Sequence, residues 1–304
     1  MPSQRVRPGK AAPSTWPAVV WTISSFTCFL SKNLIVRQES GVAPDELLER
    51  YGPVALVTGA SSGIGWGFAE ELAERGFDLV LSARRVGRLE QLAEKLKADH
   101  GTNSLIIEAD LASAEAPAQL LAETAGADIG LVISNAGFGL KGPHQANDPA
   151  TMTDMIMVNC NAPMQLAHGF IPRLTQRGKG GIVFTSSIEG LMGCPYSSAY
   201  SATKALVIAL GEGLWGELAG SGVDVLTVCP GATESEAAEK QGIDIAMLTN
   251  VMTAREVASI VLDNLANGPT CFPSAHYKAS FDQLLALPRR DALAAMAQGM
   301  KQGG

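Results

Sequence analysis

Short apolar runs recur along the chain, separated by segments long enough for helices. The runs occupy residues 54–57, 79–82, 105–108, 130–134, 181–186 and 224–229, and a last short one lies near 270–272. Continuous apolar runs of this length are typical of strands buried on both faces, and their alternation with helix-length segments favours a parallel sheet covered by helices on both sides. The pattern predicts one α/β domain with a doubly wound parallel sheet of about seven strands.

The ends of this domain are set by where the alternation begins and stops. Thr253 and Glu256 form a capping-box pattern that predicts a helix before the last strand. We expect the domain to span residues 51–288, after an N-terminal extension (1–50) that contains a short apolar segment. Residues 289–304 are expected to form a C-terminal tail.

The extension differs from the rest of the chain in charge. Residues 1–40 contain five lysines or arginines and a single acid, Glu39. The apolar stretch 18–30 is too short for a membrane-spanning helix, which takes about 20 residues, and no clean cleavage site for a signal peptide follows it. Three interpretations stay open: an interfacial anchor, a docking arm, or an extension without fixed structure. We favour weak membrane association through residues 18–36, with the protein cytoplasmic or peripheral at a membrane.

Composition narrows the class of protein. The chain has 304 residues, 46% hydrophobic and 17% charged, which is enough to bury a large core. Its net charge of -7, with no basic stripe, argues against nucleic acid as a partner. Five cysteines and four histidines are scattered without metal-ligand spacing, so we predict no metal site and reduced thiols.

A glycine-rich turn follows the first predicted strand. The segment from Thr58 to Gly65 places Gly59, Gly63 and Gly65 between a strand and a helical stretch. Glycines allow the backbone to turn sharply and approach a pyrophosphate, whose charge a helix N-terminus favours. A strand-to-helix turn without a ligand is the alternative. We predict dinucleotide contacts from Gly59, Ser61, Ser62, Gly63, Ile64 and Gly65.

The end of the second predicted strand indicates which dinucleotide binds. An NAD site usually carries an acidic residue about 20 residues after the glycines, whereas an arginine accommodates the 2′-phosphate of NADP. Here the strand ends in Ala83-Arg84-Arg85, with no acid. We predict NADP(H), with Arg84 as the first choice for the phosphate contact and Arg85 as the second, and NAD(H) stays open. A solvated basic turn is the alternative.

Tyr200, Lys204 and Ser187 form a candidate proton-transfer group. Tyr200 and Lys204 are four residues apart and so share one face of a helix, while Ser187 ends an apolar strand. A positive charge about 4 Å from the phenol contributes roughly 4 kcal/mol at an effective dielectric of about 20, so we expect Lys204 to lower the pKa of Tyr200. On most helices such a pair is only an amphipathic surface feature. Ser186 precedes Ser187 directly, and spacing to Tyr200 favours Ser187.

Taken together, these motifs resemble the short-chain dehydrogenase/reductase family. The turn from Thr58 to Gly65 matches its cofactor motif, and Ser134-Asn135-Ala136-Gly137 matches its Asn-Asn-Ala-Gly motif except at the first residue. Pro230-Gly231 matches the loop after a later strand. Coverage runs from about residue 51 to 272. The entry Tyr51-Gly52-Pro53 is similar to the steroid and 3-oxoacyl reductase branch, some of whose members are membrane-attached.

The resemblance implies a single Rossmann-type domain and a role for each matched residue. Its catalytic tetrad corresponds to Asn159, Ser187, Tyr200 and Lys204: the tyrosine exchanges a proton with a carbonyl or alcohol oxygen, the serine hydrogen-bonds that oxygen, the lysine lowers the tyrosine pKa and holds the nicotinamide ribose, and the asparagine holds a relay water. The resemblance also implies cofactor contacts from Asp110, Leu111, Asn135, Ala136, Gly137, Pro230, Gly231 and Thr233, as well as from Tyr200 and Lys204. Asp110 as the N-cap of the next helix is the alternative, and Ser235 competes with Thr233 for the nicotinamide. A homodimer or homotetramer is expected.

The substrate is predicted from the residues that follow Ser187. Residues 188–196 are apolar or uncharged apart from Glu189, and no arginine is placed to clamp a carboxylate or phosphate. We therefore expect an oxidoreductase that interconverts a carbonyl and a secondary alcohol on a bulky hydrophobic ketone or alcohol, steroid-like or long-chain 3-oxoacyl. The alternative is a non-catalytic dinucleotide-binding sensor, which would not need all four tetrad residues.

Overall fold

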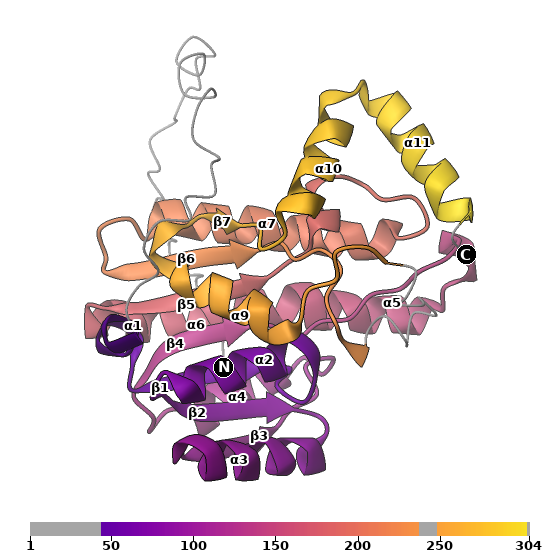
Figure 1. Cartoon of the computed structure of the whole chain (residues 1–304). Helices are drawn as coiled ribbons and strands as arrows, with labels where there is room; N and C mark the ends of the chain where they lie inside the picture. Colours follow the sequence, from indigo (N-terminus) through magenta and orange to yellow (C-terminus); the bar gives the residue numbers. More distant parts are fainter. Residues whose placement is uncertain (1–43, 237–247, 303–304) are drawn as a thin grey trace, which may run out of the picture. The chain divides into compact units, whose positions relative to one another are not determined.

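The computed structural model describes residues 44–236 and 248–302, in which seven strands form one parallel sheet (Figure 1). The strands are β1 (Val54–Thr58), β2 (Asp78–Ala83), β3 (Ser104–Glu108), β4 (Ile129–Ser134), β5 (Gly180–Thr185), β6 (Val223–Val228) and β7 (Thr270–Cys271). Their order across the sheet is β3-β2-β1-β4-β5-β6-β7. The predicted fold class is confirmed, and each predicted strand is placed to within one residue.

Helices cover both faces of the sheet. They are α1 (Pro44–Tyr51), α2 (Gly63–Glu74), α3 (Val86–His100), α4 (Ala116–Glu123), α5 (Pro149–Ile156), α6 (Ala162–Arg177), α7 (Ser198–Glu217), α9 (Ala254–Asp263), α10 (Ala275–Ala286) and α11 (Arg289–Gln302). Residues of α1, α2, α3 and α9 form a core on one face, and residues of α4, α6 and α7 form a core on the other.

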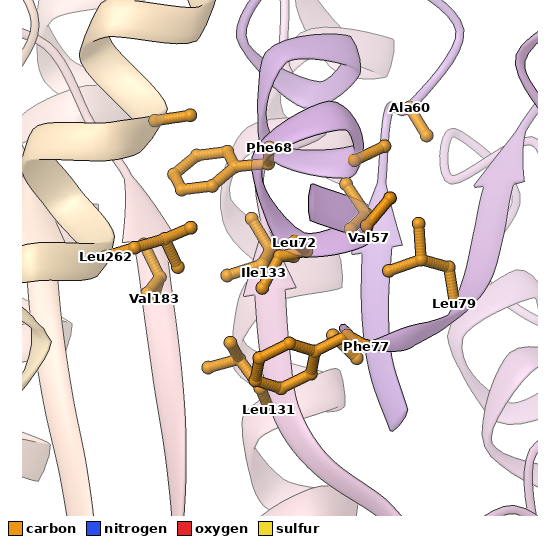
Figure 2. Packing of buried hydrophobic residues seen from close by; sticks show 14 of the residues in the cluster. Val57, Ala60, Phe68, Leu72, Phe77, Leu79, Leu131, Ile133, Val183 and Leu262 are labelled. Atoms are coloured by element: carbon orange, nitrogen blue, oxygen red, sulfur yellow. The ribbon is translucent and has the colours of Figure 1, made fainter. Parts of the chain in front are cut away.

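Successive strand residues supply the two cores in turn, as a parallel sheet buried on both faces requires. In β1, Ala55 and Val57 belong to the first core, and Leu56 between them belongs to the second. Figure 2 shows Phe68 and Leu72 of α2 among the apolar side chains of the first core. The continuous apolar runs of β1, β2, β4, β5 and β6 follow from this arrangement, because both faces of these strands are largely buried. The edge strand β3 differs, with Leu105 exposed.

The order of the strands creates a crevice between β1 and β4. From β1 the chain winds outward to β2 and β3, and then returns to start β4 on the opposite side of β1. In doubly wound sheets, ligands bind at such a reversal, outside the carboxyl ends of the strands. The residues that follow β1, β4, β5 and β6 are therefore the ones that the fold brings to one edge.

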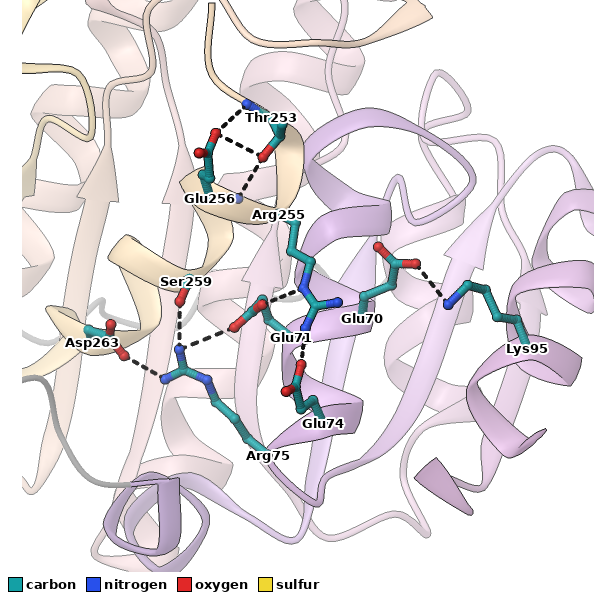
Figure 3. A network of polar contacts seen from close by, with 10 residues as sticks. All are labelled: Glu70, Glu71, Glu74, Arg75, Lys95, Thr253, Arg255, Glu256, Ser259 and Asp263. Carbon is teal, nitrogen blue, oxygen red and sulfur yellow. Dashed lines mark hydrogen bonds and ion pairs between the residues drawn. The ribbon is translucent and has the colours of Figure 1, made fainter. Parts of the chain in front are cut away.

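Helices α2 and α9 cross closely and are joined by two arginines (Figure 3). Arg75 donates to Asp263 Oδ1 at 2.7 Å, and Arg255 donates to Glu71 Oε1 at 2.7 Å. A Cβ atom on Gly67 would lie 2.5 Å from the carbonyl oxygen of Ala254, so the crossing requires glycine there. The contact fixes the start of α9 against the helix that follows the glycine-rich turn.

The predicted capping box at the start of α9 is confirmed. The backbone N of Thr253 donates to Glu256 Oε2 at 2.8 Å, and the backbone N of Glu256 donates to Thr253 Oγ1 at 3.1 Å.

Helical structure extends beyond both predicted ends of the domain. Residues 44–50, which we assigned to the extension, belong to α1, whose Leu47 and Tyr51 are fully buried in the first core. Tyr51 Oη also donates to Asp224 Oδ2 at 2.7 Å. The assigned tail, from residue 289, begins with α11, where Ala292 is buried.

The predicted membrane-associating segment, residues 18–36, lies outside the described residues. Within residues 44–236 and 248–302, no helix is both long and apolar enough to cross a membrane.

Candidate active site

The turn between β1 and α2 is shaped by glycines that leave no room for side chains. Gly59 has a φ of +68°, and a Cβ atom there would lie 2.9 Å from Ala136 Cα. A Cβ atom on Gly65 would lie 2.3 Å from the carbonyl oxygen of Gly59. Ser62 precedes α2 without a side-chain cap over its first N–H groups. This backbone cradle at a helix N-terminus suits a pyrophosphate.

The predicted contacts in the same turn are divided between the surface and the core. Ser61 is buried, Ser62 is half-buried, and Ile64 packs against the first core. Gly63, the first residue of α2, has a φ of +55°.

The loop after β4 is tied to the end of β1 through one hydroxyl. Thr58 Oγ1 accepts from the backbone N of Asn135 at 3.0 Å and from that of Ala136 at 3.1 Å. Asn135 Nδ2 donates to the carbonyl oxygen of Thr58 at 3.1 Å. Ser134, the residue that departs from the family motif, is the buried last residue of β4. Serine in place of the family's asparagine at position 134 therefore leaves the Asn135–Gly137 loop in place at the end of β4.

Arg85, rather than Arg84, lies against the glycine-rich turn. Its Nη2 donates to Ser62 Oγ at 2.8 Å and to Ser61 Oγ at 3.1 Å. Arg84 is exposed. Neighbouring residues at a strand end point to opposite sides, and the sequence does not show which side faces the turn. Which of the two arginines contacts a 2′-phosphate stays a prediction.

Asp110 and Leu111 follow β3. Asp110 Oδ1 accepts from the backbone N of Ala112 at 3.2 Å, which closes a local turn, and Leu111 is buried. Helix α4 begins only at Ala116, after Glu115. The alternative role of Asp110 as the cap of that helix is therefore wrong.

Tyr200, Lys204 and Ser187 come together as the sequence predicted. Ser187, two residues after the end of β5, lies close enough to the Tyr200 phenol to lower its pKa. Lys204 Nζ lies 5.7 Å from the centroid of the Tyr200 ring and donates to the carbonyl oxygen of Thr185 at 2.8 Å. Ser186 Oγ instead donates to the carbonyl oxygen of Lys204 at 2.7 Å. Of the two serines, Ser187 is the one beside the phenol.

The predicted lowering of the Tyr200 pKa is wrong for this structure. Burial raises the pKa of the Tyr200 phenol above its ordinary value, and the negative charge of Glu189 raises it further, while the nearby Ser187 hydroxyl lowers it. Lys204 is 4% exposed, and burial lowers the pKa of its ammonium group to about 8. Helical spacing places the lysine near the ring, but burial is the largest cause of the pKa shift of each group.

Asn159 holds the loop that follows Gly137. It lies in a π-helical segment, Met157–Asn161, between α5 and α6. Its Oδ1 accepts from the backbone N of Phe138 at 3.0 Å, and its Nδ2 donates to the carbonyl oxygen of Phe138 at 2.9 Å and to Thr203 Oγ1 at 3.0 Å. Single-turn π segments inside helices occur often at functional sites. A Cβ atom on Gly137 would lie 3.1 Å from Asn159 Oδ1 and 3.2 Å from Lys204 Nζ.

The residues after β6 lie at the same edge of the sheet, at the carboxyl ends of the strands. The carbonyl oxygen of Pro230 accepts from the backbone N of Ile188 at 3.0 Å. Thr233 Oγ1 donates to the carbonyl oxygen of Gly231 at 3.2 Å. A Cβ atom on Gly231 would lie 2.2 Å from the ring of Tyr277 in α10, so this position requires glycine.

An ion pair beside Tyr200 was not predicted. Lys141 Nζ lies 2.6 Å from Glu189 Oε1, donates to Ser197 Oγ at 3.1 Å, and lies 5.8 Å from the centroid of the Tyr200 ring. Glu189 stood out in the sequence as the one charged residue in an apolar segment. Nothing marked Lys141, which is 48 residues away in the chain.

A separate apolar cluster lies where the segment after Ser187 meets the C-terminal helices. Ile188, Met192 and Cys194 pack there with Phe281 of α10 and Ala292 of α11. The apolar side chains of residues 188–194 thus pack against apolar side chains of α10 and α11. Helix α11 lies in the segment that we had assigned to a tail.

Comparisons with known proteins agree with this geometry. The short chain dehydrogenase family model matches residues 53–246. The chain is 32% identical to a 7β-hydroxysteroid dehydrogenase of Clostridium sardiniense over 185 residues, which cover 61% of this chain and 71% of that protein. It is 30% identical to the very-long-chain 3-oxoacyl-CoA reductase-A of Danio rerio over 223 residues, which cover 70% of each.

A solved structure of similar fold is a short-chain dehydrogenase from Sphingobium yanoikuyae in complex with NADPH. It superposes with a TM-score of 0.71 and 36% sequence identity, over 80% of this chain and 95% of that one. The chain therefore belongs to the short-chain dehydrogenase family, whose enzymes interconvert hydroxyl and carbonyl groups with a nicotinamide cofactor.

Proposed function

We propose that this protein is an NADP(H)-dependent oxidoreductase acting on a bulky hydrophobic ketone or secondary alcohol, either steroid-like or a long-chain 3-oxoacyl compound. The observation that carries the proposal is the Tyr200 phenol beside Ser187, with Lys204 Nζ 5.7 Å from its ring centroid, at the sheet edge that also holds the glycine cradle.

The residues at this edge fit a dinucleotide that carries a 2′-phosphate. Gly59, Gly63 and Gly65 allow the tight turn that presents backbone N–H groups to a pyrophosphate at the N-terminus of α2, and Arg85 supplies a guanidinium group for the 2′-phosphate. Support comes from the similar Sphingobium yanoikuyae protein, whose structure contains NADPH. NAD(H) remains the second choice. When bound, the nicotinamide exchanges a hydride with the substrate carbon.

The protein's own side chains move the proton and orient the reacting oxygen. In reduction Tyr200 donates its proton to the carbonyl oxygen, and in oxidation it takes the proton from the hydroxyl. Ser187 donates a hydrogen bond to the same oxygen. Lys204 supplies positive charge below its pKa of about 8, and Asn159 holds the Phe138 loop beside it.

The preference for a hydrophobic substrate rests on the apolar cluster formed by residues 188–194 with α10 and α11. Relatives with steroid and 3-oxoacyl-CoA substrates support it, since their similarity spans most of the catalytic domain. The predicted dimer or tetramer, the cytoplasmic location and the membrane association stay predictions.

A Tyr200→Phe variant tests the proposal. The full chain is screened with NADPH against hydroxysteroids, long-chain 3-oxoacyl esters and small polar ketones, and oxidation of the cofactor is followed by absorbance. We expect turnover of the bulky apolar ketones and a loss of kcat of about 10² to 10⁴-fold in Tyr200→Phe. NADPH binding by the variant, measured by calorimetry, should stay within about threefold of wild type and shows that the fold is intact.

The same experiment addresses the alternative of a dinucleotide sensor. A sensor would bind NADPH and turn over no member of the panel. The Tyr200→Phe substitution would change neither its turnover nor its NADPH affinity. Turnover that survives in Tyr200→Phe would instead remove the phenol from the mechanism.

A further inference from the structure

The carboxylate of Glu236 lies between two arginines at the edge of the glycine-rich turn. Glu236 Oε2 is 2.6 Å from Arg85 Nη1, and Glu236 Oε1 is 3.4 Å from Arg88 Nη2. The other guanidinium nitrogens of Arg85 reach Ser61 and Ser62. One side of the Arg85 fork is therefore directed at the cofactor turn, and the other side is directed at an acid.

The backbone around Glu236 brings that acid to the turn from a distant part of the chain. Glu236 lies 151 residues from Arg85, in the segment after β6. The backbone N of Glu234 donates to the carbonyl oxygen of Met252 at 2.9 Å, which anchors the segment. Ser235 Cβ lies 3.0 Å from where a Cβ atom on Gly63 would be, so residues 235 and 236 lie directly over the N-terminus of α2.

A carboxylate in this position competes with a 2′-phosphate for Arg85, but it can accept a hydrogen bond from a 2′-hydroxyl. A phosphate binds a guanidinium group through the same paired N–H donors that a carboxylate uses, so Glu236 and a 2′-phosphate compete for Arg85. A free ribose 2′-hydroxyl, in contrast, donates a hydrogen bond to a carboxylate, as in sites that prefer NAD.

We infer that Glu236 is a specificity-determining residue that weakens binding of 2′-phosphorylated cofactors by holding Arg85 and Arg88. The inference rests on the proposed NADP(H) function and adds a residue to it. An Arg85 freed from Glu236 binds the 2′-phosphate more tightly, whereas loss of the carboxylate brings no gain for a ligand without that phosphate.

Calorimetry on the full chain tests this without turnover. Adenosine 2′,5′-bisphosphate and 5′-AMP are titrated at low salt into wild type, Glu236→Gln and the matched control Glu234→Gln, which removes the same charge from the same segment. Because the paired side chains are partly exposed, we expect Glu236→Gln to bind the bisphosphate roughly threefold to tenfold more tightly. We expect 5′-AMP affinity to be unchanged or weaker, and Glu234→Gln to match wild type for both ligands.

Three results would overturn the inference. Equal gains in Glu236→Gln and Glu234→Gln would indicate a general effect of charge, and equal gains for both ligands would indicate an effect on the adenosine site. Unchanged bisphosphate affinity in Glu236→Gln would show that the carboxylate does not compete.

These outcomes are distinct from failure of the proposed function. If wild type binds the bisphosphate more tightly than 5′-AMP and Glu236→Gln has the same affinities as wild type, the inference is refuted and NADP(H) specificity is not. If neither wild type nor Glu236→Gln binds the bisphosphate more tightly than 5′-AMP, both the inference and NADP(H) specificity are refuted. Absence of ketone turnover refutes the oxidoreductase proposal whatever the calorimetry shows.

Discussion

Tyr200 is surrounded by charges of both signs. Lys204 Nζ and Lys141 Nζ lie 5.7 and 5.8 Å from its ring centroid, and the negative charge of Glu189 acts to raise its pKa. Negative charge on Cys229 or Cys194 would raise the pKa of Tyr200 in the same direction as Glu189. Besides burial, its pKa therefore responds to side chains from separate segments of the chain, of which only Ser187 belonged to a motif visible in the sequence.

Replacing Glu189 with glutamine should make Tyr200 a better base. The substitution removes the negative charge that raises the Tyr200 pKa and leaves the Lys141 ammonium group without its carboxylate, and both changes favour the phenolate. For alcohol oxidation, which needs the deprotonated phenol, the rise of kcat/KM with pH should therefore shift to lower pH.

The control for this substitution is Glu217→Gln, at an exposed position on α7, the helix that carries Tyr200. An unshifted profile in Glu189→Gln, or an equal shift in both variants, would mean that the Lys141–Glu189 pair does not act on the phenol.

At the scale of elements, the crossing of α2 and α9 depends on the absence of a side chain at Gly67. A Cβ atom there would meet the carbonyl oxygen of Ala254 at 2.5 Å, a contact with backbone that cannot rotate away. Gly67→Ala should therefore lower the free energy of unfolding by about 1 to 3 kcal/mol, measured by urea denaturation.

Gly213→Ala is the matched control for that substitution. Gly213 lies inside α7, is exposed, and has open space around its Cβ position. Alanine is favoured over glycine in helix interiors, so this variant should be more stable by about 0.5 to 1 kcal/mol. Destabilisation of the two variants by equal amounts would contradict the close crossing.

At the scale of the whole molecule, burial of thiols makes the stability of the fold depend on alkaline pH. Burial raises the pKa of the Cys229 thiol to about 12 from an ordinary value of 9.0, and the side chain is 1% exposed. A raised pKa in the folded state means that the unfolded chain loses its proton first. The stability that this thiol contributes is present below pH 9 and is lost as the pH rises from 9 towards 12.

A Cys229→Ala variant should therefore respond less to alkaline pH than wild type. Between pH 8 and 10 the free energy of unfolding of wild type should fall by about 1 kcal/mol more than that of the variant. Urea denaturation under reducing conditions at several pH values measures the two slopes. Parallel slopes would show that the thiol ionises as readily in the folded protein as in the unfolded chain.

The sequence alone determined the features that depend on local pattern. The seven strands, the glycine turn, the Thr253–Glu256 capping box and the Tyr200–Lys204 spacing each depend on residues close together in the chain. Periodicity, turn chemistry and helical spacing act over a few residues, and so these features could be predicted.

Only the tertiary structure decided the electrostatics of the site and the ends of the domain. It placed Arg85 rather than Arg84 at the turn, brought Glu236 to Arg85 across 151 residues, and set Lys141 beside Tyr200. It also reversed the predicted direction of the Tyr200 pKa. The physical reason is that pKa values and ion pairs depend on burial and on distances through space, which sequence spacing does not contain.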